Sequence, residues 1–241
     1  MSAVPPLAGR SAVVSGASRG IGLAIAQVFV ANGARVAMLA RGAQALQAAA
    51  DAIGANAIPV VCDAADADAV TRAAGQVQDR FGGAPDLLVN NAGLFELARV
   101  AETAPANFAR ALDVNLVAPF LLVHALLPGM QARRSGHVIS IGSIADRATF
   151  PENGAYAASK YGLRALHEVL RAELRGTGVR TTLVSPGPVN TSLWDAIDPD
   201  SRTGFTRRDQ MLGAESVAAA VLYAATQPAS VNVDELRLSR S

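Results

Sequence analysis

Short apolar runs alternate with helix-forming stretches along the chain, and this alternation constrains the fold more than any other sequence feature. The apolar runs are typical of buried strands and lie at residues 12–15, 35–39, 57–61, 86–90, 137–141, 179–184 and 233–238. The stretches between them have helical patterns and cover residues 20–33, 43–53, 66–81, 105–132, 154–174 and 215–226. Strands that alternate with helices form a parallel sheet covered on both faces. We therefore expect a single α/β domain over residues 1–241, with a doubly wound parallel sheet of seven strands.

Composition argues against several classes of protein. A net charge of +1 gives no reason to expect a nucleic acid or a membrane surface as partner. The longest apolar run, residues 116–127, is too short to span a bilayer, and the N-terminus lacks a signal-peptide pattern. The single cysteine, Cys62, excludes an internal disulfide and fits a reducing compartment. We expect a cytoplasmic protein with no nucleic-acid or membrane partner.

A glycine-rich turn follows the first predicted strand. Gly16 allows a tight turn, Gly20 a close approach of the backbone to phosphate, and Gly22 close packing of helix on strand. Strand, glycine turn and helix form the context in which a helix N-terminus binds phosphate. The spacing G-x-x-x-G-x-G differs from the commoner dinucleotide fingerprint, so an ordinary turn is the alternative.

Two arginines are expected near that turn. Arg19 lies within it, and Arg41 follows the second strand, where an NAD site would carry a carboxylate for the adenosine 2′-hydroxyl. Two guanidiniums suit a 2′-phosphate because each can grip it with paired hydrogen bonds. The pattern favours NADP(H) over NAD(H), and two solvated arginines are the alternative.

Tyr156 and Lys160 are one helical turn apart, so their side chains share a face. Lys160 is the only lysine in the chain. An ammonium beside a phenol favours the phenolate, so we expect Lys160 to lower the pKa of Tyr156 towards the range of a working proton donor. A solvated lysine and an interfacial tyrosine would have the same spacing.

Other candidate residues follow predicted strands or interrupt a helix. Asn90 to Gly93 leave the fourth strand at the edge where open α/β sheets bind ligands, and Ser143 follows the fifth. Asn115 and Pro119 are poor helix-interior residues and predict a kink within 105–132. The histidines have no ligand spacing, so we expect no metal site.

Residues 192–212 are polar and irregular, which is typical of a mobile lid over a substrate. Arg202, Arg207 and Arg208 lie there and could attract an acidic substrate, although a solvated loop face is the other interpretation.

Taken together, these motifs closely resemble the short-chain dehydrogenase/reductase family over essentially the whole chain. The matching residues are Ser15 to Gly22, Asp63, Asn90 to Gly93, Asn115, Ser143, Tyr156, Lys160 and Pro186 to Thr191. Ser15 stands where the family usually has threonine, and the hydroxyl is kept. The C-terminus lacks the Gly-Gly ending of many fatty-acid-synthesis members, so it is more similar to the hydroxy-acid and carbonyl reductases.

The resemblance implies a Rossmann fold with a cofactor half near 9–135, a catalytic half near 136–241 and a lid near 190–212. It implies catalytic roles for Ser143, Tyr156 and Lys160, and a water-linked proton relay at Asn115; a helix kink without chemistry is the alternative for Asn115. The cofactor-binding residues it implies are Gly16, Ser18, Arg19, Gly20, Ile21, Gly22, Arg41, Asp63, Asn90, Ala92, Gly93, Tyr156, Lys160, Pro186, Gly187, Val189 and Thr191.

The implied activity is hydride exchange between NADP(H) and the alcohol/carbonyl pair of a small molecule, as in short-chain alcohol dehydrogenases and carbonyl reductases. The alternatives are a 3-oxoacyl-thioester reductase acting on acyl carrier protein and a protein that senses NADP(H) without turnover. The family usually forms homotetramers or dimers by pairing the long helices, so we expect a homo-oligomer.

Overall fold

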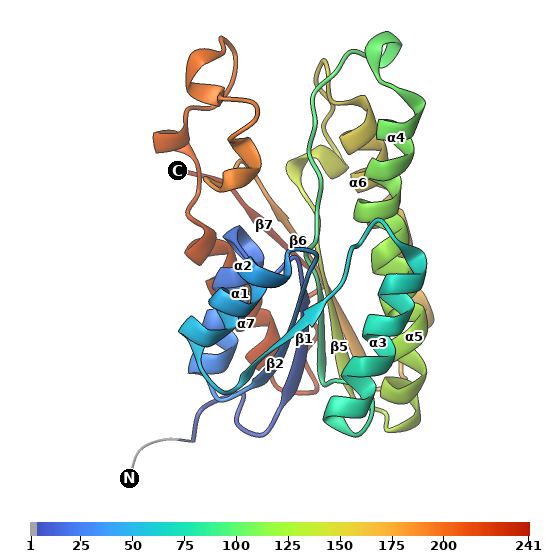
Figure 1. Cartoon of the computed structure of the whole chain (residues 1–241). Coiled ribbons are helices and arrows are strands. Elements are labelled where there is room, and N and C mark those ends of the chain that lie inside the picture. Colours follow the sequence, from blue (N-terminus) through green and yellow to red (C-terminus); the bar gives the residue numbers. More distant parts are fainter. Residues whose placement is uncertain (1–3) are drawn as a thin grey trace.

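A parallel sheet of seven strands forms the centre of the computed structural model, which describes residues 4–241 (Figure 1). The strand order is β3-β2-β1-β4-β5-β6-β7. The strands are β1 Ser11–Ser15, β2 Arg35–Ala40, β3 Ala57–Val61, β4 Leu87–Asn90, β5 Gly136–Ile141, β6 Val179–Pro186 and β7 Glu235–Leu238. The predicted doubly wound sheet is confirmed, and residues 1–3 of the predicted domain lie outside the described residues.

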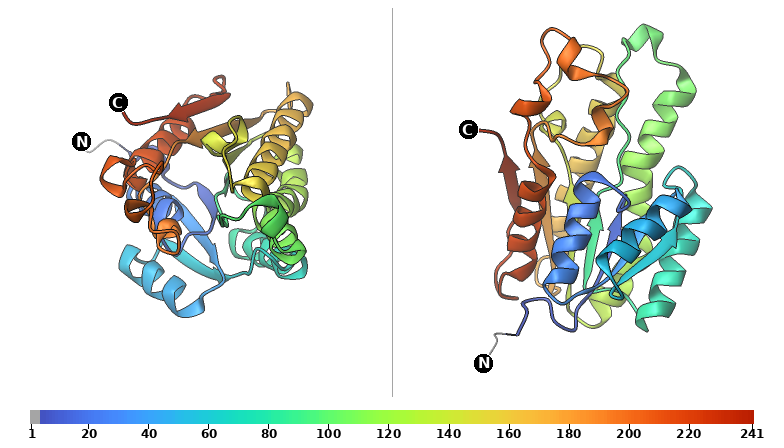
Figure 2. Two further views of the ribbon diagram at one scale, coloured as in Figure 1. Left: turned by 90° about the horizontal axis from the view of Figure 1, so that it is seen from above. Right: turned by 60° about the vertical axis from the view of Figure 1, so that its left-hand side comes forward.

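Helices cover both faces of this sheet (Figure 2). One face carries α1 Gly20–Ala31, α2 Ala43–Ile53 and α7 Ala214–Thr226. The other carries α3 Ala67–Phe81, α4 Pro105–Leu112, α5 Ala118–Ala132 and α6 Gly154–Glu173. Each face buries its own apolar cluster, which is the reason the strands read as continuous apolar runs.

Strand β1 shows how the sequence produces these two layers. Side chains alternate across a strand, so Ala12 and Val14 join the cluster under α1 and α7, whereas Val13 joins the cluster under α3 and α5. All three are fully buried. β1 pairs with β2 on one side and β4 on the other, which places its end at the middle of the sheet edge.

The predicted kink in helix 105–132 is a π-helical turn. Residues Asp113–Val117 form this turn between α4 and α5, and Asn115 lies in it, fully buried. The Asn115 side-chain oxygen accepts from the backbone N–H of Leu94 at 2.8 Å, and its amide donates to the Leu94 carbonyl and to the Ser159 hydroxyl. The polar side chain therefore ties this helix to the loop after β4 and to α6.

The stretch 105–132 is also apolar enough to span a membrane by length and composition, the one such stretch among residues 4–241. Its mean hydropathy is 1.7, and 39% of the window is buried within the protein. The buried part packs against α3 and the sheet, as in the core helix of a folded domain. The exposed part carries apolar side chains such as Val117 and Phe120.

The last predicted strand begins two residues later than expected, at Glu235. The side-chain oxygen of Asn232 accepts from the backbone N–H of Thr181 at 2.9 Å, and its amide donates back to the Thr181 carbonyl at 3.0 Å. A side chain thus takes the place of ladder bonds at the start of the pairing between β6 and β7.

Candidate active site

A pocket of about 980 Å³ lies at the carboxyl ends of the strands. Its walls come from the ends of β1, β2, β4, β5 and β6, together with the start of α6 and the 190–212 segment. This volume is at the upper end for small-molecule sites, enough for a dinucleotide and a second small molecule. The predicted ligand edge of the sheet is thus where the pocket forms.

The glycine turn forms one end of the pocket. Gly16 and Gly20 have φ of +67° and +57°, which side-chain-bearing residues rarely adopt. A Cβ on Gly16 would lie 2.8 Å from the Cα of Ala92, and one on Gly22 would collide with the Gly16 carbonyl. No side chain caps the N-terminus of α1, and its first turn has no acidic residue. The uncapped N–H groups and the close backbone packing fit a phosphate group.

Ser15 and Asn91 hold this turn against the loop after β4. The Ser15 hydroxyl accepts from the backbone N–H groups of Asn91 and Ala92, both at 3.0 Å. The Asn91 amide donates to the Ser15 carbonyl at 2.8 Å. Asn91, which lies within the predicted stretch Asn90 to Gly93, is therefore a pocket residue.

The prediction placed Asn90 in the cofactor site, and the structure does not. Asn90 is the last residue of β4, is only 2% exposed, and does not line the pocket. Neither of its side-chain polar atoms has a hydrogen-bond partner among residues 4–241. Strand alternation explains the difference, since consecutive residues point to opposite sides of the sheet.

Arg19 and Arg41 line the pocket as predicted, and both are exposed. Neither forms an ion pair within residues 4–241. Asp63 lines the same end, with its carboxylate accepting from the backbone N–H of Ala65 at 3.0 Å. Burial, with a smaller contribution from Asp63, raises the pKa of Cys62 to about 11, so this thiol is no nucleophile near neutral pH.

Ser143, Tyr156 and Lys160 lie together on another wall of the pocket. Ser143 caps a short 3-10 turn, Ile144–Asp146, and its hydroxyl oxygen accepts from the backbone N–H of Ala145 at 3.1 Å. The Lys160 ammonium lies 5.6 Å from the centre of the Tyr156 ring and donates to the Ile141 carbonyl at 2.9 Å. The three predicted residues are therefore adjacent.

The expectation that Lys160 lowers the pKa of Tyr156 is wrong in this structure. Burial raises the pKa of Tyr156 above its ordinary value, a hydrogen bond with Ser143 lowers it in part, and the Asp146 carboxylate raises it further. Burial also lowers the pKa of Lys160 to about 8, partly offset by Asp146. Desolvation of the phenol is therefore the largest influence on the pKa of Tyr156.

Asp146 is a buried residue behind the pocket wall that supports the site and that the sequence analysis missed. Its side chain has no exposed surface and forms ion pairs with Arg147 at 2.7 Å and Arg164 at 3.6 Å. Ser185 on β6 donates to the same carboxylate, and Arg147 also binds Glu235 on β7. This network fixes the Ser143 turn to α6, β6 and β7. The Ser-x-x-Asp spacing from Ser143 to Asp146, a capping box in the structure, is the sequence signal that could have revealed it.

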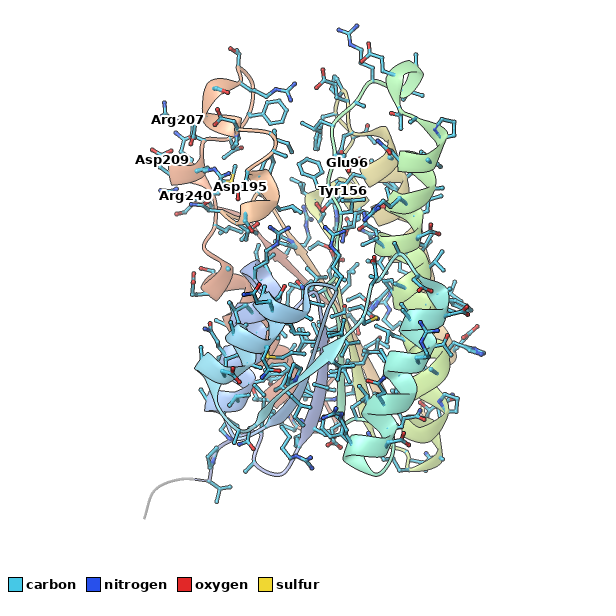
Figure 3. The ribbon with its side chains drawn as sticks, in the orientation of Figure 1. Glu96, Tyr156, Asp195, Arg207, Asp209 and Arg240 are labelled. Atoms are coloured by element: carbon cyan, nitrogen blue, oxygen red, sulfur yellow. The ribbon has the colours of Figure 1, made fainter. Side chains whose placement is uncertain are left out.

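The 190–212 segment contains three short 3-10 turns, Ser192–Trp194, Pro199–Ser201 and Arg208–Gln210. Figure 3 shows its labelled Asp195, Arg207 and Asp209 on the opposite side of the molecule's upper end from Tyr156. The three candidate arginines for an acidic substrate are all paired with carboxylates: Arg202 with Glu152, Arg207 with Asp209, and Arg208 with Asp195. Only the first of these pairs lines the pocket.

Most of the predicted site residues line the pocket. The predicted residues that line the pocket are Gly16, Ser18, Arg19, Gly20, Ile21, Arg41, Asp63, Ala92, Gly93, Ser143, Tyr156, Lys160, Pro186, Gly187, Val189 and Thr191. Gly22, Asn90 and Asn115 lie behind the lining. Residues 4–241 contain no group of three or more His, Cys, Asp or Glu that could hold a metal ion.

The sheet order and the uncapped glycine turn define a doubly wound α/β protein of the Rossmann type. The family model described as short chain dehydrogenase matches residues 10–202. An uncharacterized oxidoreductase of Staphylococcus aureus is 34% identical over 95% of this chain and 96% of its own length. A metagenomic short-chain oxidoreductase solved in complex with NADP has a TM-score of 0.84 and 34% identity, covering 98% of this chain and 99% of its own. The chain therefore belongs to the short-chain dehydrogenase/reductase family and is an oxidoreductase of that family.

Glycine betaine reductase of Emericella nidulans is 36% identical over 98% of this chain. The chain spans only 19% of that relative's length. The similarity therefore concerns one part of a much longer protein.

Proposed function

We propose that this protein transfers hydride between NADP(H) and the alcohol/carbonyl pair of a small molecule, as a carbonyl reductase or alcohol dehydrogenase. The observation that carries the proposal is the grouping of Ser143, Tyr156 and Lys160 on the wall of a pocket whose other end holds the glycine turn. The NADP complex of the metagenomic relative supports the choice of cofactor.

The residues of the pocket fit the proposed cofactor. The uncapped N–H groups at the start of α1 would hold its pyrophosphate, and Arg19 and Arg41 would bind its 2′-phosphate. Asp63 would contact the adenine, and Lys160 the ribose hydroxyls next to the nicotinamide. When bound in its reduced form, the nicotinamide supplies the hydride for the carbonyl carbon.

Ser143 and Tyr156 would act on the carbonyl oxygen. The Ser143 oxygen accepts from the N–H of Ala145, and its proton would be donated to the carbonyl oxygen when a substrate is bound. Tyr156 gives its proton to the carbonyl oxygen as the carbon gains hydride, so that an alcohol and a phenolate result. The raised pKa of Tyr156 keeps the phenol protonated at neutral pH, as a proton donor requires.

Asn115 supports this site from behind. It donates to the Ser159 hydroxyl at 2.8 Å, and Ser159 donates to the Tyr156 carbonyl at 2.7 Å. The predicted water-linked relay would return a proton to Tyr156 after each turnover.

A 3-oxoacyl-thioester reductase would need a basic surface to dock the acyl carrier, and the candidate arginines of the 190–212 segment are ion-paired instead.

Tyr156→Phe tests the proposal. The variant should lose at least about 1,000-fold in kcat because the proton donor is removed, while its Kd for NADPH changes less than about twofold. NADPH consumption is followed by absorbance over a panel of ketones, diketones, quinones and acetoacetyl thioesters. A variant with wild-type turnover would remove the proposed mechanism.

We also propose that the chain forms a homo-oligomer through α5 and α6. Four large apolar side chains remain 37–55% exposed there. They are Val117 at the end of the π-helical turn, Phe120 on α5, and Tyr161 and Val169 on α6. A second copy of the chain would cover them. Large exposed apolar side chains on the pairing helices are the groups that such an interface would bury.

A further inference from the structure

Aromatic side chains connect Tyr156 to the 190–212 segment. The ring of Phe95 lies 4.7 Å from that of Tyr156 and 5.1 Å from that of Trp194, centre to centre. Trp194 in turn lies 6.4 Å from Phe205. All three pairs meet edge to face, the arrangement that aromatic rings prefer. The pocket wall nearest the phenol is therefore apolar and aromatic.

The indole ring in this wall is fixed in orientation. The Trp194 Nε1–H donates to the Val189 carbonyl at 3.0 Å, so its polar edge is satisfied within the segment. The rest of the ring is available for apolar contact. A planar apolar group next to Tyr156 would pack against Phe95 and Trp194.

An ion pair lies at the Phe205 end of this aromatic wall. The Arg202 guanidinium lies 4.8 Å from the centre of the Phe205 ring and donates to the Glu152 carboxylate at 2.8 Å. Both residues line the pocket. Arg202 belongs to the 190–212 segment, whereas Glu152 lies just before α6, so the pair joins two walls of the same pocket.

Glu152 occupies an unusual backbone conformation. Its φ is +66°, a left-handed value that favours glycine or asparagine over glutamate. The backbone N–H of Ala98 donates to the Glu152 carbonyl at 2.9 Å and holds the residue there. A strained conformation at a residue that keeps its carboxylate points to a task for that carboxylate.

We propose that Glu152 determines substrate specificity by neutralising Arg202, and that the site accepts uncharged carbonyl compounds with an aromatic or other apolar body. The inference rests on the proposed carbonyl reduction. A substrate carboxylate that enters this pocket finds the guanidinium of Arg202 already bound to Glu152. The negative charge of Glu152 also repels the substrate carboxylate, whereas it does not repel an uncharged substrate.

The test compares an acid with its own ester. Benzoylformate and methyl benzoylformate share the aromatic ring and the ketone, and differ in the charge next to it. Wild-type protein should favour the ester in kcat/KM. Glu152→Gln removes the competing carboxylate with little change of shape and frees Arg202. The acid-to-ester ratio of kcat/KM should rise by about fivefold or more.

Binding gives a second measurement that does not depend on turnover. Trp194 is the only tryptophan in the chain, so its fluorescence reports on the aromatic wall directly. Titration with the acid and the ester gives two Kd values for each variant, without cofactor. The Kd ratio should change in Glu152→Gln in the same direction as the kinetic ratio.

Three variants make the result specific to the ion pair. Glu96→Gln removes an exposed carboxylate next to Phe95 that has no ion-pair partner within residues 4–241, and it should leave both ratios unchanged. Arg202→Gln leaves Glu152 unpaired and should lower the acid-to-ester ratio. This variant also tests the inference if Glu152→Gln fails to fold. The double variant Glu152→Gln/Arg202→Gln should lose the gain seen in Glu152→Gln alone.

The outcomes separate this inference from the proposed function. An unchanged acid-to-ester ratio in Glu152→Gln, in kinetics or in fluorescence, overturns the role of Glu152. Tighter binding of the acid than of the ester by wild-type protein overturns the substrate class. Absence of turnover on the whole carbonyl panel, combined with the expected change in Kd ratio, supports the inference and counts against the proposed reductase.

Discussion

Arg41 decides the cofactor preference if the 2′-phosphate binds at the end of β2. The residue is exposed, lines the pocket and has no ion-pair partner within residues 4–241. Arg41→Asp should weaken NADPH binding by about 10- to 100-fold, because a charge-assisted hydrogen bond is replaced by repulsion. Binding of NADH should be unchanged or tighter.

Kd values for both cofactors, measured by calorimetry, give the preference directly. Arg72→Asp is the control, since Arg72 is an exposed arginine of α3 outside the pocket. An unchanged NADPH/NADH ratio in Arg41→Asp would show that the 2′-phosphate is held elsewhere.

At the residue scale, spacing predicted the positions of the reactive groups and not their electrostatics. Tyr156 and Lys160 share a helix face whatever the surroundings, so their adjacency follows from the sequence. The direction of the Tyr156 pKa depends on burial and on Asp146, which only the folded chain brings near. The ion pair of Glu152 with Arg202 joins residues 50 positions apart and leaves no local pattern.

At the scale of elements, replacing each of two helical glycines with alanine should have opposite effects on stability. An alanine Cβ at Gly22 in α1 would collide with the Gly16 carbonyl, which is backbone and cannot move aside alone. Gly22→Ala should therefore destabilise the protein by roughly 2 kcal/mol or more and weaken NADPH binding, because the glycine turn must shift.

Gly75→Ala is the matched substitution in α3. No atom lies within 4 Å of the Cβ it would add. The change should stabilise the protein by about 0.5–1 kcal/mol, since glycine is the poorer helix former. Urea denaturation of the two variants gives both values. Equal effects at the two positions would contradict the close packing of α1 on the glycine turn.

Most elements were predictable because the central strands are buried on both faces and most helices have periodic apolar residues. The edge strands β3 and β7 are only partly buried. Helix α3 also has a clear beginning and end, with Asp66 capping its first turn and Gly82 in a left-handed conformation after its last. The π-helical turn at Asp113–Val117 was predictable only as a kink. Its geometry depends on Asn115 bonding to Leu94, a contact between distant parts of the chain.

At the scale of the whole molecule, Phe120→Glu tests the proposed homo-oligomer. A carboxylate at this exposed position of α5 would be desolvated in an interface of two copies. Light scattering should report a dimer or larger for the wild type and a smaller species for the variant. Val231→Glu, at an exposed apolar residue outside α5 and α6, should not change the mass. A monomeric wild type would contradict the proposal.

Stability should fall when the pH is lowered from about 6.5 to 4. Burial lowers the pKa of His167 from 6.5 to about 4, and burial also lowers that of His137 well below 6.5. Between these values the unfolded chain binds protons that the folded chain does not, so acid favours unfolding. For His167 the loss by pH 4 is on the order of 3 kcal/mol.

Thermal unfolding between pH 8 and pH 4 measures this slope. His167→Gln should flatten it, although the variant loses the bond between His167 and Ser140 and is less stable at pH 8. His124→Gln, at an exposed imidazole on α5, should keep the wild-type slope. Parallel curves for His167→Gln and the wild type would show that His167 binds its proton equally well in the folded and unfolded chains.

The strand order also determines how long one edge of β1 stays unpaired during synthesis on the ribosome. β1 lies between β2 and β4, so its second edge stays unpaired until β4 has been made, after β2, β3 and three helices have emerged. At ordinary translation speeds this interval is on the order of ten seconds. During that time an apolar strand, Ala12 to Val14, presents free backbone N–H and C=O groups to other chains. The risk of aggregation and the need for chaperones are therefore greatest while the first half of the chain is being synthesised.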